Sequence, residues 1–128
     1  MRQDGDDIVQ FLSMIRINEN GTRRPDEQLM RAMGQLIDEM TAEGTLLDTA
    51  GLRPTVEGKR VRLRSGRISV FDGPFTETRE VIGGYAILEA PTMERAVELT
   101  RRFLAVHGEG WELECEVRQM ERGPDGCS

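Results

Sequence analysis

Apolar and polar positions follow two different periods along this chain, and each period predicts a type of element. Residues 8–17 form a nearly continuous apolar run, IVQFLSMIRI, which is typical of a strand covered on both faces. In the stretch 26–43 apolar residues recur every three or four positions, which predicts an amphipathic helix that ends at Gly44. A loop over 18–24 connects the two elements, and Pro25 suits a first helical turn.

The same two periods return in the second half of the chain. Residues 46–52 are typical of a short strand and 81–90 of a longer one. Thr92 is a candidate N-cap for a second helix that ends before Gly108. Strict alternation over 112–120 predicts a final strand.

A hairpin is predicted between these halves. Residues 60–64 and 67–71 are predicted strands, and Ser65-Gly66 between them forms a two-residue turn. This register places Leu63 opposite Ile68 on one side, together with Val61 opposite Val70. The other side carries Arg60, Arg62, Arg64 and Arg67.

The element order is therefore β-α-β-hairpin-β-α-β, an α+β class. It predicts a ferredoxin-like βαββαβ fold with an extra hairpin, in which an antiparallel sheet has two helices on one face. The first strand is apolar on both faces, although both helices lie on one side of the sheet. A second copy of the chain is the simplest cover for the other face, so we expect a homodimer packed sheet to sheet.

Length and charge limit the classes of function. The 128 residues fit a single domain, with a core over about 7–121 and flexible ends at 1–6 and 123–128. The net charge of −6 argues against nucleic-acid binding, which needs a basic surface. No apolar run reaches membrane-spanning length, and the acidic start is unlike a signal peptide, so no membrane association is expected.

The cysteines and the single histidine limit the classes of function further. Cys115 and Cys127 form no C-x-x-C pair, which favours reduced thiols and a cytoplasmic location. His107 is the single histidine, and zinc-binding and nucleotide-binding motifs are absent, so neither a metal nor a cofactor is expected.

The segment Asp72-Gly73-Pro74-Phe75 interrupts the second hairpin strand. Pro74 fixes its own φ and donates no hydrogen bond, so the hairpin ladder must end there. The Asp72 carboxylate must find a donor at Phe75 or beyond, or face solvent or a ligand. Turn chemistry favours a rigid corner braced by Asp72 and anchored in the core by Phe75. The alternative is an acid/base couple of Asp72 with His107, which otherwise reads as a cation at a helix C-terminus.

Two charged stretches have structural interpretations as well as functional ones. Glu112, Glu114 and Glu116 share one face of the last strand at roughly 6.6–6.8 Å spacing, too far apart to chelate a metal. They fit an edge strand protected by charge or paired with arginines. The arginine side of the hairpin is suited to a phosphate or carboxylate, to an acidic partner surface, or to solvent.

The segment DGPFTETRE at residues 72–80, followed by Gly83-Gly84-Tyr85, resembles the signature of the YCII-related, or DGPF-domain, family. Arg79 replaces the usual lysine, and residues 51–54, 60–62 and 116–118 match further. The resemblance implies a dimeric α/β-barrel. In short relatives a His–Asp pair, with its histidine on the first helix, suggests enzymes. Because residues 26–43 contain no histidine, that role does not transfer.

Two hypotheses about function stay open, and whether the chain is an enzyme is part of the choice. The first is a small-molecule site near the DGPF turn, with acid/base activity supplied by Asp72 and secondarily by His107. Its ligand-binding residues would be Phe75, Glu77, Arg79, Tyr85 and Arg62. The alternative is a non-enzymatic regulatory or interaction protein. The family resemblance links that role to extracytoplasmic-function sigma factor signalling.

Overall fold

The computed structural model describes residues 9–19, 24–75 and 80–121, and six strands and two α-helices lie within them. In chain order the elements are β1 (Val9–Ile17), α1 (Glu27–Glu43), β2 (Leu46–Gly51), the 3₁₀ turn η3 (Thr55–Glu57), β3 (Lys59–Arg64), β4 (Arg67–Asp72), β5 (Val81–Ala90), α2 (Met93–Ala105) and β6 (Glu114–Gln119). The ends predicted to be flexible, 1–6 and 123–128, lie outside the described residues, as does Cys127.

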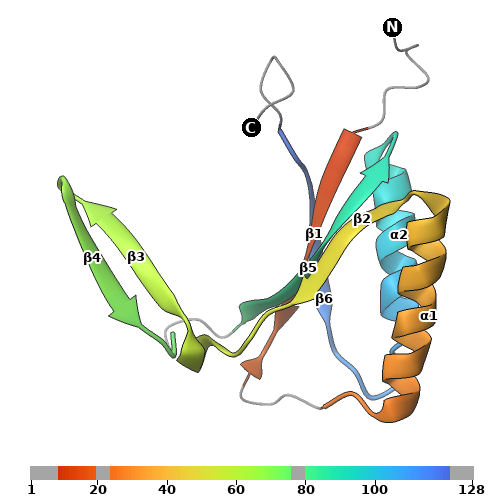
Figure 1. Ribbon diagram of the computed structural model, residues 1–128, viewed down its shortest axis with the longest axis horizontal. Helices are drawn as coiled ribbons and strands as arrows, with labels where there is room; N and C mark the ends of the chain where they lie inside the picture. The colour runs from red at the N-terminus through yellow and green to blue at the C-terminus, as the bar shows by residue number, and fades with distance from the viewer. Residues whose placement is uncertain (1–8, 20–23, 76–79, 122–128) are drawn as a thin grey trace, which may run out of the picture.

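Four strands form one antiparallel sheet in the order β2-β5-β1-β6. This is the ferredoxin-like order, so the predicted fold class is confirmed, with β6 at an edge. Both helices cover the same face of the sheet, which we call the inner face (Figure 1). No described helix has the length and apolar content needed to cross a membrane.

The core lies between the helices and one end of the inner face. Alternate residues of β1 point inward, and Phe11 is 1% exposed while Leu99 of α2 is fully buried. Two buried hydroxyls in this layer are satisfied, because Ser13 Oγ lies 3.3 Å from Thr100 Oγ1 and Thr100 donates to the Ala96 carbonyl. The buried hydrophobic residues are Phe11, Leu36, Met40, Leu46, Leu88, Ala90, Ala96 and Leu99.

The helix ends mostly follow the predicted capping chemistry. Thr92 caps α2 by accepting from the Arg95 N–H, and Gly44 ends α1 in the left-handed region at φ 82°. The start of α1 differs from the expectation, because Asp26 is the N-cap and Pro25 precedes the helix. The Asp26 carboxylate accepts from the Leu29 N–H at 2.8 Å, which satisfies a free donor of the first turn.

The hairpin β3–β4 is a separate two-stranded sheet that projects away from the side of the main sheet opposite the helices (Figure 1). Its register is the predicted one, with Val61 opposite Val70 and Leu63 opposite Ile68. Ser65 and Gly66 both have positive φ, 51° and 76°, as a type I′ turn requires. The four apolar residues of the hairpin, Val61, Leu63, Ile68 and Val70, are 58–72% exposed.

Candidate functional site

A cavity of about 560 Å³ lies between the two helices and the inner face of the sheet. Its walls are almost entirely apolar, and Ser13, Thr49, Thr100 and His107 supply the polar side chains. The lining residues are Ser13, Ile15, Ile17, Pro25, Leu29, Met30, Met33, Gly34, Leu36, Ile37, Met40, Leu46, Thr49, Ala50, Gly51, Gly83, Gly84, Ala86, Leu88, Leu99, Thr100, Phe103, His107, Trp111 and Leu113. The space continues one end of the packed core toward the start of α1.

Small residues create this space. Gly34 faces it from α1, and a Cβ added there would meet no atom within 4 Å. On β5 the wall is made by Gly84 and Ala86, whose small size leaves the inner face shallow. A Cβ at Gly84 would lie 3.0 Å from the Ala50 carbonyl oxygen and 3.1 Å from Ile15, so the absence of a side chain at Gly84 lets these two other lining residues pack against its backbone.

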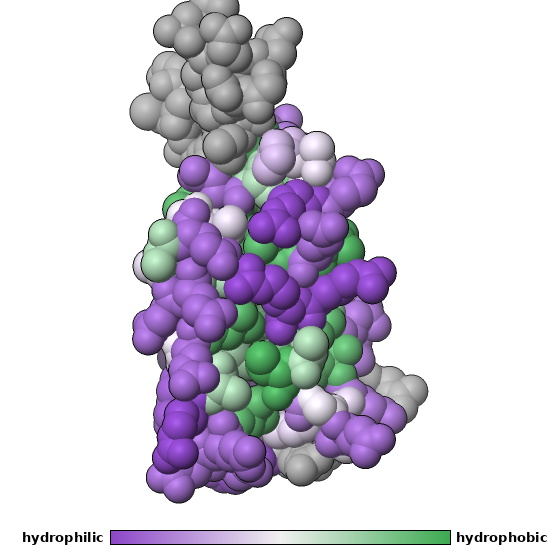
Figure 2. Space-filling model, turned by 90° about the vertical axis from the view of Figure 1, so that its right-hand side faces the viewer, coloured by the Kyte–Doolittle hydropathy of each residue, from purple (hydrophilic) through white to green (hydrophobic). Residues whose placement is uncertain are grey.

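The cavity opens to solvent on the helical face of the molecule. Figure 2 shows this face, where apolar side chains are visible between hydrophilic surfaces. Of the lining residues, Met30 is 63% exposed and Gly34 is also exposed, so both belong to the opening. The sequence pattern indicated that the methionines of this helix pack in the core. Met40 does, whereas Met30 lies at the cavity entrance.

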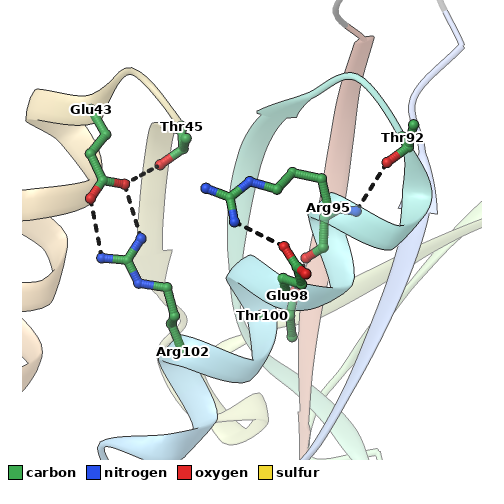
Figure 3. Close-up of polar contacts among 8 residues, drawn as sticks. Glu43, Thr45, Thr92, Arg95, Glu98, Thr100 and Arg102 are labelled. Carbon is green, nitrogen blue, oxygen red and sulfur yellow. Dashed lines mark hydrogen bonds and ion pairs between the residues drawn. The ribbon is translucent and has the colours of Figure 1, made fainter.

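An ion pair joins the two helices at the other end of α1 (Figure 3). Arg102 of α2 donates to both carboxylate oxygens of Glu43, at 2.9 and 3.3 Å, and lies 3.5 Å from Glu39. The hydrogen bonds from Arg102 lower the pKa of the Glu43 carboxyl, and Thr45 donates to the same carboxylate. This contact links the last turn of α1 to α2.

We expect Arg102→Met to lower stability slightly at neutral pH and to make no difference in acid. The pKa of Glu43 is lower in the folded state than in the unfolded chain, so its stabilising effect is present above the unfolded value and is lost as pH falls through the folded value. Urea titrations at several pH values would measure this. Arg95→Met, which breaks the Arg95–Glu98 pair within α2, is the control. An unchanged difference between wild type and Arg102→Met at every pH would contradict the role of Glu43.

His107 lies half-buried on the cavity wall just after α2. Its Nδ1 lies 3.2 Å from the Phe103 carbonyl oxygen and 3.3 Å from that of Leu104. Carbonyl oxygens only accept, so Nδ1 carries the proton and Nε2 of the neutral ring is an acceptor. Phe103 and Trp111 contact the ring edge to face, with centroids at 5.1 and 5.4 Å.

A second, smaller pocket of about 270 Å³ adjoins this end of the cavity. The two share Leu29, His107 and Trp111, and the smaller one adds Arg24, Asp26 and Gln28. The apolar cavity thus adjoins a smaller, more polar pocket, and His107 lines both.

The DGPF segment lies elsewhere, at the base of the hairpin. Asp72 is opposite Lys59 in the strand register, and the two side chains form an ion pair although Asp72 is 77% exposed. Gly73 packs directly on η3, where a Cβ would come within 1.7 Å of the Thr55 carbonyl oxygen. The Gly73 N–H donates to the Gly58 carbonyl at 2.9 Å. Turn chemistry predicted a donor to Asp72 at Phe75 or beyond, with solvent or a ligand as the alternative, whereas the partner that the structure shows is the upstream Lys59 side chain.

A carboxylate from the end of β1 attaches this corner to the main sheet. Glu19 accepts from the Thr55 N–H at 2.8 Å and from the Thr55 hydroxyl at 2.7 Å. Within the corner Arg53 pairs with Glu57, and its hydrogen bonds lower the pKa of the Glu57 carboxyl. We call the contacts of Glu19, Thr55 and Gly73 the hairpin joint.

Two aromatic rings, Phe71 in the hairpin and Phe75 just after it, lie under guanidinium groups. The Arg60 guanidinium is 4.0 Å from the Phe75 ring centroid, and that of Arg62 is 4.5 Å from Phe71. Phe75 is half-buried and does not join the buried core, so it anchors the hairpin base and not the centre of the protein. Glu77 and Arg79 lie outside the described residues.

Tyr85 points to the opposite, outer face of the sheet. Its hydroxyl donates to Asp48 Oδ2 at 3.1 Å, and this hydrogen bond raises the pKa of the phenol. On the same face Arg16 pairs with Glu80 at 3.4 Å and with Glu116 at 3.5 Å. The predicted pairing of the last strand's acids with arginine is thus confirmed for Glu116.

The residues predicted to form one site are therefore distributed over three places. Asp72, Phe75 and Arg62 belong to the hairpin, Tyr85 to the outer face, and His107 to the cavity. Among the described residues Asp72 pairs with Lys59, and His107 contacts its own helix and Trp111, so they form no couple. No group of three metal-ligating side chains occurs in the described parts of the chain.

Sequence reasoning did not find the cavity. The available signal was the coincidence of small residues on facing elements: Ala50-Gly51, Gly83-Gly84 and Ala86 on the strands, with Gly34 on the helix.

Comparison with known proteins gives two matches. A family model described as YCII-related domain matches residues 9–120. An uncharacterised protein of Rhizobium meliloti (strain 1021) is 29% identical over 80 residues, which are 62% of this chain and 64% of that protein. The chain thus spans somewhat less than two thirds of the length of this relative.

Proposed function

This chain belongs to the YCII-related domain family, and we propose that it binds a small, mainly apolar molecule carrying one hydroxyl group in the cavity between its helices and its sheet. The observation that carries the proposal is a 560 Å³ space with mainly apolar walls, in which His107 is one of few polar side chains and has Nε2 as an acceptor in its neutral form. Ligand sites commonly have this size and this combination of apolar walls and few polar groups.

The hydroxyl follows from the tautomer of His107. In the neutral ring with Nδ1 donating to the main chain, Nε2 has an unshared pair, and among the described residues it has no hydrogen-bond partner. An alcohol or phenol donates to such a nitrogen. A neutral imidazole in this state is also what a general base requires, so acid/base chemistry, if the chain has any, belongs to His107 and not to Asp72.

We expect 2-naphthol to bind more tightly than 2-methylnaphthalene, which has the same shape without the hydroxyl. One hydrogen bond contributes about 0.5–1.5 kcal/mol, or roughly 2–10-fold in Kd. His107→Phe should remove this difference while keeping an aromatic ring between Phe103 and Trp111. Fluorescence titration measures both ligands. Equal Kd values for the two ligands in wild type would refute the hydroxyl contact.

Gly34→Leu should abolish binding of both ligands without loss of stability. The new side chain enters a space where a Cβ meets no atom within 4 Å, and leucine is a better helix former than glycine by about 0.8–1 kcal/mol. Gly34→Ala, which adds one methyl group, is the matched control and should retain binding. Undiminished binding in Gly34→Leu would place the ligand outside this cavity.

We also propose that the chain forms a homodimer in which the outer faces of two sheets pack together. Leu12 and Met14 are half-buried there, Ile82 is 44% exposed, and neither helix covers this face. Paired salt bridges around Arg16 would form a polar rim for such an interface. Leu12→Asp should shift the protein to monomer in sedimentation equilibrium. A monomer mass for wild type at micromolar concentration would exclude the dimer.

Asp72 has a structural role in this proposal, because its partner Lys59 closes the base of the hairpin. The free thiol of Cys115 fits the reducing conditions of a cytoplasmic protein, and burial raises the pKa of that thiol.

A further inference from the structure

We propose that the ligand is a hydroxy acid, with an apolar body in the cavity, its hydroxyl group at His107 and a carboxylate that binds Arg24 in the smaller pocket. This inference rests on the proposed function and deepens it, because it adds a charged group to the ligand and so names a chemical class. The feature that carries it is the pocket of about 270 Å³ beside the cavity.

The smaller pocket continues the space of the cavity. Leu29, His107 and Trp111 line both, so the two volumes meet at these side chains. A molecule whose apolar part fills the cavity can therefore extend past His107 into the smaller pocket. The order of groups along the ligand follows from this arrangement: the apolar part, then the hydroxyl at His107, then the group that enters the smaller pocket.

The two spaces differ in the chemistry of their walls. Among the described residues, no acid, lysine or arginine lines the cavity. The smaller pocket is lined by Arg24, Asp26 and Gln28 besides its apolar residues. Ligand sites commonly combine apolar walls with a few polar groups that fix the orientation of the bound molecule. The polar end of the ligand is therefore expected in the smaller pocket.

Arg24 selects a carboxylate for that end. It is the one cationic side chain among the described residues that line the two spaces, and it is exposed. It forms no ion pair with any described residue. A guanidinium group donates two parallel hydrogen bonds to a carboxylate, which gives both affinity and a fixed geometry.

Asp26 determines on which side of the pocket the carboxylate lies. Its Oδ1 accepts from the Leu29 N–H at 2.8 Å, so the side chain is held at the start of α1. A ligand carboxylate beside it would be repelled, whereas one beside Arg24 is attracted. Asparagine is an equally good N-cap, so Asp26→Asn removes the repulsion and keeps the helix start.

The test is isothermal titration calorimetry of the full chain with two probes. 2-Naphthylglycolate carries a hydroxyl and a carboxylate on one carbon, and 1-(2-naphthyl)ethanol has a methyl group in place of the carboxylate. We expect the acid to bind roughly 3–10-fold more tightly, as for a partly exposed charge-assisted contact. The net charge of −6 repels anions in general, so this preference would identify a local cation. It should shrink between about 50 and 500 mM NaCl.

Three variants locate the carboxylate. Arg24→Gln should remove the advantage of the acid and leave the Kd of the alcohol unchanged. The matched control is Arg31→Gln, which alters the net charge equally at an exposed position of α1 that lines neither space. It should keep the advantage. Asp26→Asn should tighten binding of the acid by roughly 2–5-fold, because a like charge is removed.

The outcomes separate the carboxylate from the cavity itself. Equal Kd values for the two probes in wild type, with 2-naphthol still bound, would refute the carboxylate contact and leave the proposed function standing. An advantage of the acid that survives in Arg24→Gln, or that is lost equally in Arg31→Gln, would overturn the role of Arg24. If neither probe nor 2-naphthol binds, both proposals are wrong.

Discussion

Leu99→Ala should lower the free energy of unfolding by roughly 2–5 kcal/mol. Leu99 is completely buried, it packs in the core and it also forms part of the cavity wall. Its truncation removes apolar burial and joins new empty volume to an existing 560 Å³ space, so the neighbouring side chains have little support for collapse. Urea unfolding followed by circular dichroism measures the loss.

The control for this prediction is Leu47→Ala. Leu47 lies on β2, next in sequence to the buried Leu46, and is 45% exposed, so its truncation should change stability by only about 0.5 kcal/mol. Leu99→Ala should still bind 2-naphthol, because the wall is moved outward and the acceptor at His107 is unchanged. Equal losses for the two leucine variants would show that Leu99 is not part of a packed core.

Gly73→Ala should have the largest effect of any single methyl group added to the hairpin base. The new Cβ would lie 1.7 Å from the Thr55 carbonyl oxygen and 2.7 Å from its carbon, and these are main-chain atoms that cannot rotate away. The hairpin must therefore move off η3 and lose the Gly73–Gly58 hydrogen bond. We expect a loss of roughly 1–3 kcal/mol, as for other overpacked sites.

Gly34→Ala adds the same methyl group where no atom lies within 4 Å, and it should raise stability by about 0.5–1 kcal/mol. Opposite signs for the two glycine variants are thus the expected result. Limited proteolysis adds a local readout, because Gly73→Ala should expose the hairpin base to cleavage. A fully stable Gly73→Ala with an uncleaved hairpin would contradict the close packing on Thr55.

Local chemistry accounts for what could be predicted from the sequence. The alternation in residues 60–71 determines the hairpin register, because a two-residue turn at Ser65-Gly66 leaves one pairing. Thr92 begins α2 and Gly44 ends α1 through hydrogen bonds to neighbours three to four residues away. The strand order follows from the element order through the ferredoxin-like plan.

The candidate site depends on contacts that no local pattern encodes. The cavity brings together Gly34 of α1 with Gly84 and Ala86 of β5, which lie some fifty residues later in the chain, and small side chains leave no periodic pattern in the sequence. The partner of Asp72, Lys59, is found only once both hairpin strands are aligned. Glu19 and Thr55 are 36 residues apart and meet through the fold.

The hairpin β3–β4 has one more consequence, which concerns solubility. Both of its strands are edge strands within a two-stranded sheet, so each presents unpaired main-chain groups to which strands of other molecules could add. Alternating arginines make the same segment a poor template for such stacking, since a third strand of identical sequence would bring like charges together. The arginines would thus protect the exposed hairpin against aggregation.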